Sequence, residues 1–114
     1  MNTAPDINSI PTEITHQGTT HQKRLVPPGG SHGRLETMNY AWLEPGNQLA
    51  SHIHPDGEEF YLFLEGSGEI LVDTVWSSVS IGSFVTVPPQ TEHSVRNTSD
   101  ERLVFITLRT VESE

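Results

Sequence analysis

Short stretches of alternating apolar and polar residues, separated by clusters of Gly and Pro, make up most of this chain. Residues 34–43 and 102–110 alternate in this way, and residues 58–64 are rich in aromatic and aliphatic side chains. A period of two is typical of β-strands, and no segment carries a convincing helical period. The pattern predicts an all-β sandwich or barrel. Further strands are expected over residues 23–27, 69–72, 84–87 and 93–97, with a tight connection over residues 73–78.

Charge and composition exclude several classes of protein. The chain has 15 Asp and Glu against 6 Lys and Arg, and its net charge of -9 would repel the phosphates of a nucleic acid. No apolar run approaches the roughly 20 residues needed to span a membrane. The N-terminus lacks the features of a secretory signal, so a cytoplasmic protein is expected. The absence of Cys excludes a disulfide framework, thiol catalysis and sulfur-ligated metals.

The most informative pattern lies in residues 46–66. His52 and His54 are two residues apart, which places both imidazoles on one face of an extended strand. Glu59 stands at the start of the next expected strand, and His93 opens a later one after a Pro-Pro turn. Three imidazoles and one carboxylate, without sulfur, are a suitable ligand set for a divalent transition metal. The pattern therefore predicts a metal site inside the sheet.

These residues resemble the two motifs of the cupin superfamily. The first motif is Gly, five residues, His-x-His, three or four residues, Glu, six residues and Gly; the matching residues are Gly46, His52, His54, Glu59 and Gly66. The second is Gly, five residues, Pro-x-Gly, two residues, His, three residues and Asn; the matching residues are Gly82, Pro88, His93 and Asn97. Gln90 replaces the expected Gly, so the motif does not specify the conformation of the turn after Pro88.

The resemblance implies a fold, a ligand set and an assembly. It implies a double-stranded β-helix, the jelly-roll or cupin barrel, similar to the mannose-6-phosphate isomerase-like and oxalate decarboxylase-like cupins. It also implies that His52, His54, Glu59 and His93 hold the metal. The length of 114 residues fits one cupin β-barrel domain over residues 23–114, preceded by an N-terminal arm or tail over residues 1–22. That segment is either a partly ordered tail or an arm that pairs with the sheet edge of a partner, and a homodimer is expected.

Several functions are compatible with such a site. One divalent transition metal per chain is expected, and Fe, Mn, Ni, Zn, Cu and Co all suit the ligands. The leading interpretation is a mononuclear metal-dependent enzyme that acts on a small polar metabolite, as a dioxygenase or as a Lewis-acid isomerase, decarboxylase or lyase. The alternative is a non-enzymatic module that binds or senses a sugar or metabolite in the same pocket. The third interpretation is a purely structural dimer with a vestigial site, because a fold does not specify function.

Tyr61 shares a strand face with Glu59 and is the candidate catalytic residue. Its hydroxyl could contact the substrate, or its ring could simply belong to the core. Each ligand histidine should donate its second ring N–H to an acceptor. The candidate acceptors are Asn97, Thr86 and Gln48.

Other polar residues have weaker expectations. Arg96 and Arg109 could bind a substrate carboxylate if they face the cavity, although Arg96 is expected to point to solvent. Free surface positions are expected for His16 and His21, and His32 is either a solvated loop histidine, which is favoured, or a substrate contact at the barrel mouth. Core or cavity lining is expected for Phe63, Phe84, Trp42 and Met38.

Overall fold

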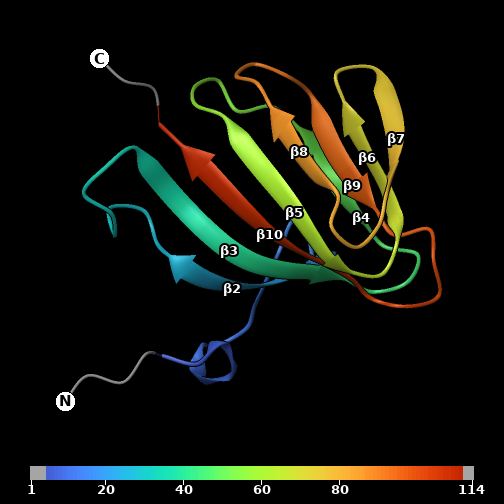
Figure 1. Cartoon of the computed structure of the whole chain (residues 1–114), viewed down its shortest axis with the longest axis horizontal. Coiled ribbons are helices and arrows are strands. Elements are labelled where there is room, and N and C mark those ends of the chain that lie inside the picture. Colours follow the sequence, from blue (N-terminus) through green and yellow to red (C-terminus); the bar gives the residue numbers. More distant parts are fainter. Residues whose placement is uncertain (1–4, 112–114) are drawn as a thin grey trace.

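Two antiparallel β-sheets face each other in the computed structural model, which describes residues 5–111 (Figure 1). The larger sheet has the strand order β1-β2-β3-β10-β5-β8, and the smaller has the order β4-β9-β6-β7. The all-β jelly roll predicted from the sequence is confirmed. The strands are β1 (Glu13–Thr15), β2 (Thr20–Val26), β3 (Leu35–Leu43), β4 (Gln48–His52), β5 (Glu59–Glu65), β6 (Gly68–Val72), β7 (Val75–Val79), β8 (Phe84–Val87), β9 (His93–Arg96) and β10 (Leu103–Thr110), preceded by a 3-10 turn, η1 (Ile7–Ser9).

The hydrophobic core lies between the sheets at one end of the barrel. Alternate residues of β3, β10 and β5 point inward, and Leu43, Phe105 and Phe63 among them are completely buried. Ile70 of β6 and Val95 of β9 meet them from the smaller sheet. The period-two pattern of each strand therefore closes this end of the barrel with apolar side chains.

The inward-facing positions change from apolar to polar along the same strands. On β10 the inward residues after Phe105 are Thr107 and Arg109, and on β5 the inward residues before Phe63 are Tyr61 and Glu59. Strand register brings these positions together, because Thr107 pairs with Tyr61 and Arg109 pairs with Glu59. On β3, Asn39 pairs with Thr107 and Thr37 pairs with Arg109, so the inward-facing polar positions continue onto a third strand. The barrel consequently has one apolar end and one polar end.

The outward face of the larger sheet is also apolar. Register aligns four residues in one row across β8, β5, β10 and β3; these are Phe84, Leu62, Ile106 and Tyr40. Phe84 is 79% exposed and Leu62 is 39% exposed, so part of this row faces solvent in a single chain. The expectation that Phe84 lines the core or cavity is wrong, because its register with Leu62 places it on the outward face. It is also wrong for Trp42 and Met38, which share the outward face of β3 with Tyr40.

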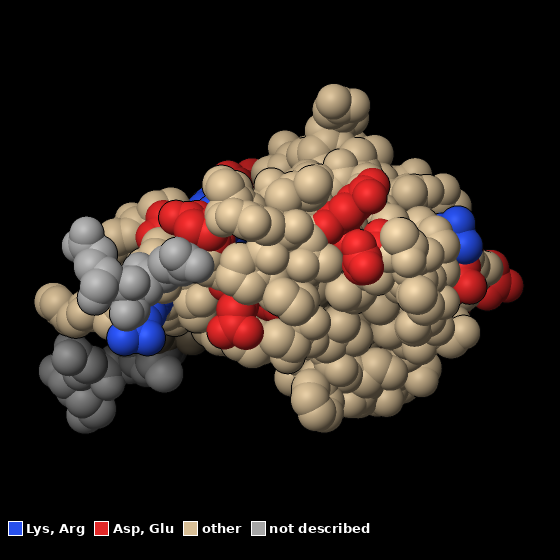
Figure 2. Space-filling view, turned by 90° about the horizontal axis from the view of Figure 1, so that it is seen from above, with Lys and Arg blue, Asp and Glu red and all other residues tan. Residues whose placement is uncertain are grey.

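The surface carries the acidic charge of the chain. Figure 2 shows Asp and Glu at several places on one face, with Lys and Arg confined to small areas near its ends. Across residues 5–111, no helix is long and apolar enough to cross a membrane. The cytoplasmic location stays a prediction.

Two segments differ from the sequence-based expectation. The strand expected from residue 23 begins at Thr20, and β1 pairs with it inside the same chain, so residues 13–15 and 20–22 lie in the larger sheet. The tight connection expected over residues 73–78 is instead a two-residue turn followed by β7. Asp73 adopts a positive φ of 63°, which suits a two-residue hairpin turn and lets Val75 pair directly with Val72.

Two motif glycines serve different purposes. Gly46 and Gly66 both have a positive φ, of 82° and 79°. A Cβ on Gly66 would collide with the backbone carbonyl of Arg102, whereas nothing lies within 4 Å of a Cβ on Gly46. Gly66 is therefore required both for its backbone conformation and for close approach of two chain segments.

Gly66→Ala should destabilise the protein more than Gly46→Ala. Both variants carry the cost of a left-handed alanine, about 1–2 kcal/mol. The collision in Gly66→Ala adds about 1–3 kcal/mol to that cost. Urea denaturation of both variants measures the difference in the free energy of unfolding. Equal losses in the two variants would contradict the close approach at Gly66.

Candidate metal centre

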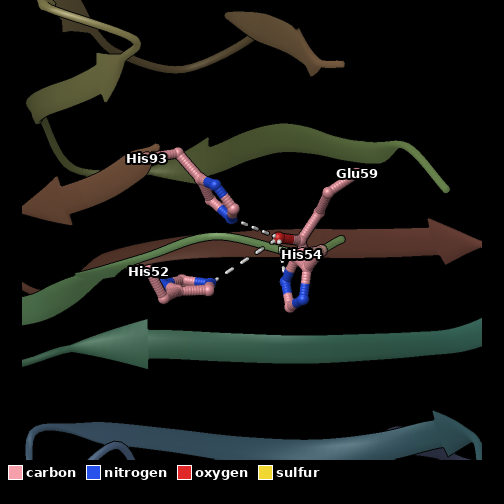
Figure 3. A group of neighbouring side chains, drawn as sticks. All are labelled: His52, His54, Glu59 and His93. Carbon is pink, nitrogen blue, oxygen red and sulfur yellow. Dashed lines mark hydrogen bonds and ion pairs between the residues drawn. The ribbon is translucent and has the colours of Figure 1, made fainter. Parts of the chain in front are cut away.

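The four predicted metal ligands come from the ends of three strands and one loop. His52 is the last residue of β4, His93 is the first residue of β9, and the two are directly paired across the smaller sheet. Glu59 is the first residue of β5 in the larger sheet. His54 lies just beyond the end of β4, so it reaches the site from a loop rather than from the strand predicted for it. Figure 3 shows the four side chains pointing toward one another.

The donor atoms converge on one carboxylate oxygen. Oε1 of Glu59 lies 2.9 Å from Nε2 of His93, 3.3 Å from Nε2 of His54 and 4.0 Å from Nε2 of His52. All four ligand atoms lie within 4.8 Å of one another. Ligand atoms lie about 2.0–2.2 Å from a bound ion, so two of them are at most roughly 4.4 Å apart. The largest separation here, 4.8 Å, exceeds this limit only slightly, so small side-chain shifts would let all four atoms bind one ion. The residues present could therefore hold a metal ion.

Backbone carbonyls orient two of the imidazoles. Nδ1 of His52 lies 2.9 Å from the carbonyl oxygen of Ala50, and Nδ1 of His93 lies 2.9 Å from that of Thr91. Because a carbonyl only accepts, each Nδ1 carries the proton in a neutral ring and each Nε2 keeps its lone pair. Nε2 is the nitrogen that faces Glu59 in both cases. Both rings thus have the tautomer of a metal ligand.

The side-chain acceptors expected for these two rings are wrong. Gln48 donates to the Ser94 hydroxyl, and Asn97 donates to the carbonyls of Leu43 and Glu101. Thr86 pairs with Phe60, on the outward face of the larger sheet. Each of the two rings instead contacts the carbonyl two residues before it in the same chain segment.

Electrostatics favours the ligand forms of His52 and Glu59. Burial lowers the pKa of His52 from 6.5 to about 4, which keeps that ring neutral. Burial alone would raise the pKa of Glu59, but the hydrogen bonds and charges of His54 and His93 lower it to about 2. His93 Nε2 lies 2.9 Å from the ionised oxygen of Glu59, so a proton or a metal ion between the two atoms is favourable. The cluster can therefore accept a cation at this position.

Tyr61 lies behind Glu59 and is 2% exposed. Its hydroxyl donates to Oε1 of Glu59 at 3.1 Å, and burial together with the Glu59 charge raises the pKa of the phenol. The hydroxyl therefore remains a donor at neutral pH and fixes the carboxylate. A direct role in catalysis stays a prediction.

A cavity of about 270 Å³ opens beside the cluster. His52, His54 and Glu59 form part of its wall, while His93 is buried behind them. Most of the remaining wall comes from the larger sheet, to which Glu59 also belongs, and is mostly polar. That wall includes Gln22, Arg24, Thr37, Asn39, Thr107 and Arg109. The polar end of the barrel is therefore a ligand-sized space next to the candidate metal site.

The two arginines singled out in the sequence have different surroundings. Arg109 lines the cavity. Arg96 lies outside it, where it pairs with Glu69 at 2.7 Å and its guanidinium lies 3.8 Å from the centre of the Trp76 ring. Strand parity explains the difference, because Arg109 alternates with inward-facing Thr107 whereas Arg96 is on the opposite face to His93.

His16 is a cavity residue that sequence reasoning missed. It lies in the turn between β1 and β2, lines the cavity and remains exposed. Its ring centre is 5.3 Å from that of His52, and partial desolvation on the cavity side lowers the pKa of His16. No local signal indicated this position, because it depends on how the β1–β2 hairpin folds over the barrel mouth. His32 is in an exposed loop as expected, while His21 is stacked on Trp42 with 5.3 Å between ring centres.

Two curated relatives share most of this chain. The dimethylsulfoniopropionate lyase DddW of Ruegeria pomeroyi is 43% identical over 94 residues, which cover 79% of this chain and 60% of the lyase. Protein SchB of Streptomyces halstedii is 36% identical over 85 residues, which cover 73% of this chain and 62% of SchB. The chain thus spans about three fifths of the length of each relative.

The fold is shared with solved structures. The crystal structure of a predicted oxalate decarboxylase from Thermotoga maritima superposes with a TM-score of 0.89 at 19% identity, covering 96% of this chain and 100% of that one. At this identity the likeness concerns the fold alone. A family model described as the cupin domain matches residues 40–109, a segment that contains both histidine motifs. With more than half of its length matched, the chain belongs to the cupin domain family.

Proposed function

We propose that this cupin is a metal-dependent enzyme that acts on a small polar metabolite. The observation that carries the proposal is the convergence of three imidazole nitrogens and one carboxylate oxygen on the wall of a polar cavity. In this proposal His52, His54, Glu59 and His93 hold one divalent transition metal, and Tyr61 fixes the Glu59 carboxylate. When bound, such an ion supplies Lewis-acid chemistry at a substrate oxygen.

The relatives support the enzyme interpretation over a purely structural one. DddW, at 43% identity, is named a lyase. A lyase reaction is therefore favoured over dioxygenase and isomerase reactions for this chain. The alternative remains a module that binds a metabolite in the same cavity without converting it.

Turnover separates the enzyme from the binding module. Protein loaded in turn with Fe, Mn, Ni or Zn is incubated with a mixture of small polar metabolites, and their depletion is followed by mass spectrometry. An enzyme depletes at least one metabolite, and His54→Ala abolishes that depletion. Ligand binding that survives chelation, with no depletion under any of these metals, would instead establish the binding module.

His54→Ala should weaken metal binding by at least about 100-fold, because it removes a directly coordinating nitrogen and even outer partners contribute 10- to 100-fold. Elemental analysis after equilibrium dialysis measures the ratio of metal to protein. The matched control is His32→Ala, which alters an exposed loop histidine and should bind like the wild type. Equal metal content in His54→Ala and wild type would contradict the ligand assignment.

The metal-free protein should lose stability as the pH falls from 6.5 to 4, partly because of His52. The pKa of His52 is about 4 in the folded protein, and the ordinary value of 6.5 applies to the unfolded chain. Between these values the unfolded chain binds more protons, so the free energy of unfolding decreases as pH falls through this window, and this contribution is absent above it. His52→Gln should show a smaller decrease in urea denaturation with a chelator present.

His32→Gln serves as the control, since its exposed loop position should preserve the wild-type pH profile. If the free energy of unfolding of His52→Gln and of the wild type depended on pH in the same way, His52 would have the same pKa in the folded and unfolded states. That result would refute the buried, neutral state assigned to this ring.

We further propose that the chain forms a homodimer through the outward face of the larger sheet. The row of Phe84, Leu62, Ile106 and Tyr40 is apolar and crosses four adjacent strands. A second copy presents the same row, so a two-fold axis can bury both faces against each other. A chain of this size also gains from burying more surface.

Phe84→Asp should shift the protein from dimer to monomer in sedimentation velocity, by placing a charge in the interface. Phe84 is 79% exposed in the single chain, so the substitution leaves the fold intact. Ile81→Asp is the matched control, because Ile81 is 73% exposed but lies in the turn between β7 and β8. A monomeric wild type, or equal dissociation of both variants, would rule out this interface.

A further inference from the structure

The geometry points to a small hydroxycarboxylate as the class of ligand, with its carboxylate bound by Arg109. This inference rests on the proposed function, because it assigns the substrate class of the same cavity. It makes Arg109 the residue that determines specificity for an acid over a neutral analogue.

Arg109 lies beside the candidate metal ligands. It is an inward residue of β10 whose direct cross-strand partner is Glu59 on β5. Paired residues of neighbouring strands have Cβ atoms about 5 Å apart, so the two side chains border the same part of the cavity. Both line the 270 Å³ space. A metabolite of a few carbon atoms can therefore reach the guanidinium and the metal site together.

Three polar atoms around this cavity lack a hydrogen-bond partner. Nε of Arg109, Oδ1 of Asn39 and Oγ1 of Thr15 are buried and unpaired, and all three residues line the cavity. The other unpaired buried side-chain atoms among residues 5–111 are Nδ1 of His21 and Nε1 of Trp42, and neither residue lines it. A buried polar group without a partner is costly, so the concentration of three at one cavity indicates a polar ligand.

The chemistry of these atoms describes the ligand. Nε–H of Arg109 is a donor and needs an acceptor, which a carboxylate oxygen supplies with the strength of a charged hydrogen bond. Oδ1 of Asn39 is an acceptor and needs a donor, which a ligand hydroxyl supplies. The Thr15 hydroxyl can act in either role. A molecule that carries both a carboxylate and a hydroxyl offers a partner of the right kind for Arg109 and for Asn39.

The charges that line the cavity are mainly positive, in contrast to the net charge of -9 of the chain. Arg24 and Arg109 line the cavity, and among residues 5–111 the one carboxylate in its wall is Glu59, which a divalent ion would neutralise. The acidic partners of the two arginines are Glu13 and Asp56, at 3.2 and 3.6 Å, and neither lines the cavity. An anion in this space is therefore attracted by both arginines and by the ion.

Arg109 is the stronger candidate of the two arginines. Glu13 already accepts from both Nε and Nη2 of Arg24, at 3.3 and 3.2 Å. Asp56 lies near Nη2 of Arg109 and leaves Nε unpaired. Arg24 thus contributes charge, whereas Arg109 has a free donor for a carboxylate.

The test compares acids with their uncharged amides. Isothermal titration calorimetry of zinc-loaded protein measures glycolate against glycolamide and lactate against lactamide. The wild type should bind at least one acid more tightly than its amide. Arg109→Gln should bind that acid roughly 10- to 100-fold more weakly, as expected for the loss of a charged hydrogen bond, with little change for the amide. Arg109→Lys keeps the charge without the planar fork and should show an intermediate loss.

Arg102→Gln is the matched control, because Arg102 pairs with Glu44 on the surface and lies outside the cavity. Its acid-to-amide preference should equal that of the wild type. The inference is overturned if no acid binds better than its amide in the wild type, or if both Arg109 variants keep the wild-type preference. Zinc content measured on the same samples separates the two proposals: failure to bind zinc refutes the proposed function, whereas normal zinc with an unchanged preference refutes only the carboxylate assignment.

Discussion

The direct pairing of His52 with His93 across β4 and β9 is the constraint on which the site depends. It places two imidazoles side by side at a strand end, and the carbonyls of Ala50 and Thr91 then turn both Nε2 atoms inward. Glu59 approaches from the other sheet, so the site joins the two halves of the barrel. The candidate site and the contact between the two sheets therefore involve the same four side chains.

The apolar core and the polar cavity occupy opposite ends of the barrel. Apolar inward residues such as Phe63 and Phe105 close one end, and the next inward positions of the same strands supply Tyr61, Glu59 and Arg109. Tyr61 belongs to both regions, because its ring packs in the core while its hydroxyl holds Glu59. A small chain can thus position a polar site without a separate supporting domain.

The sequence predicted what depends on local spacing and missed what depends on distant contacts. The all-β class followed from strand periodicity, whereas the jelly roll and the convergence of His52, His54, Glu59 and His93 followed from the resemblance to the cupin motifs. Side-chain acceptors for the imidazoles were predicted wrongly, since the nearer carbonyls can be recognised only from backbone geometry. His16 could not be placed at the cavity, because its position depends on the β1–β2 hairpin. The orientation of Arg109 stayed open until strand register was known.

X-ray absorption spectroscopy of protein loaded with one zinc ion per chain tests the central claim most directly. We predict a first shell of nitrogen and oxygen at roughly 2.0–2.2 Å, with multiple scattering from three imidazoles. Loss of one imidazole from the spectrum of each single histidine variant would identify all three ligands. A shell of oxygen atoms alone, or fewer than three imidazoles in the wild type, would contradict the account.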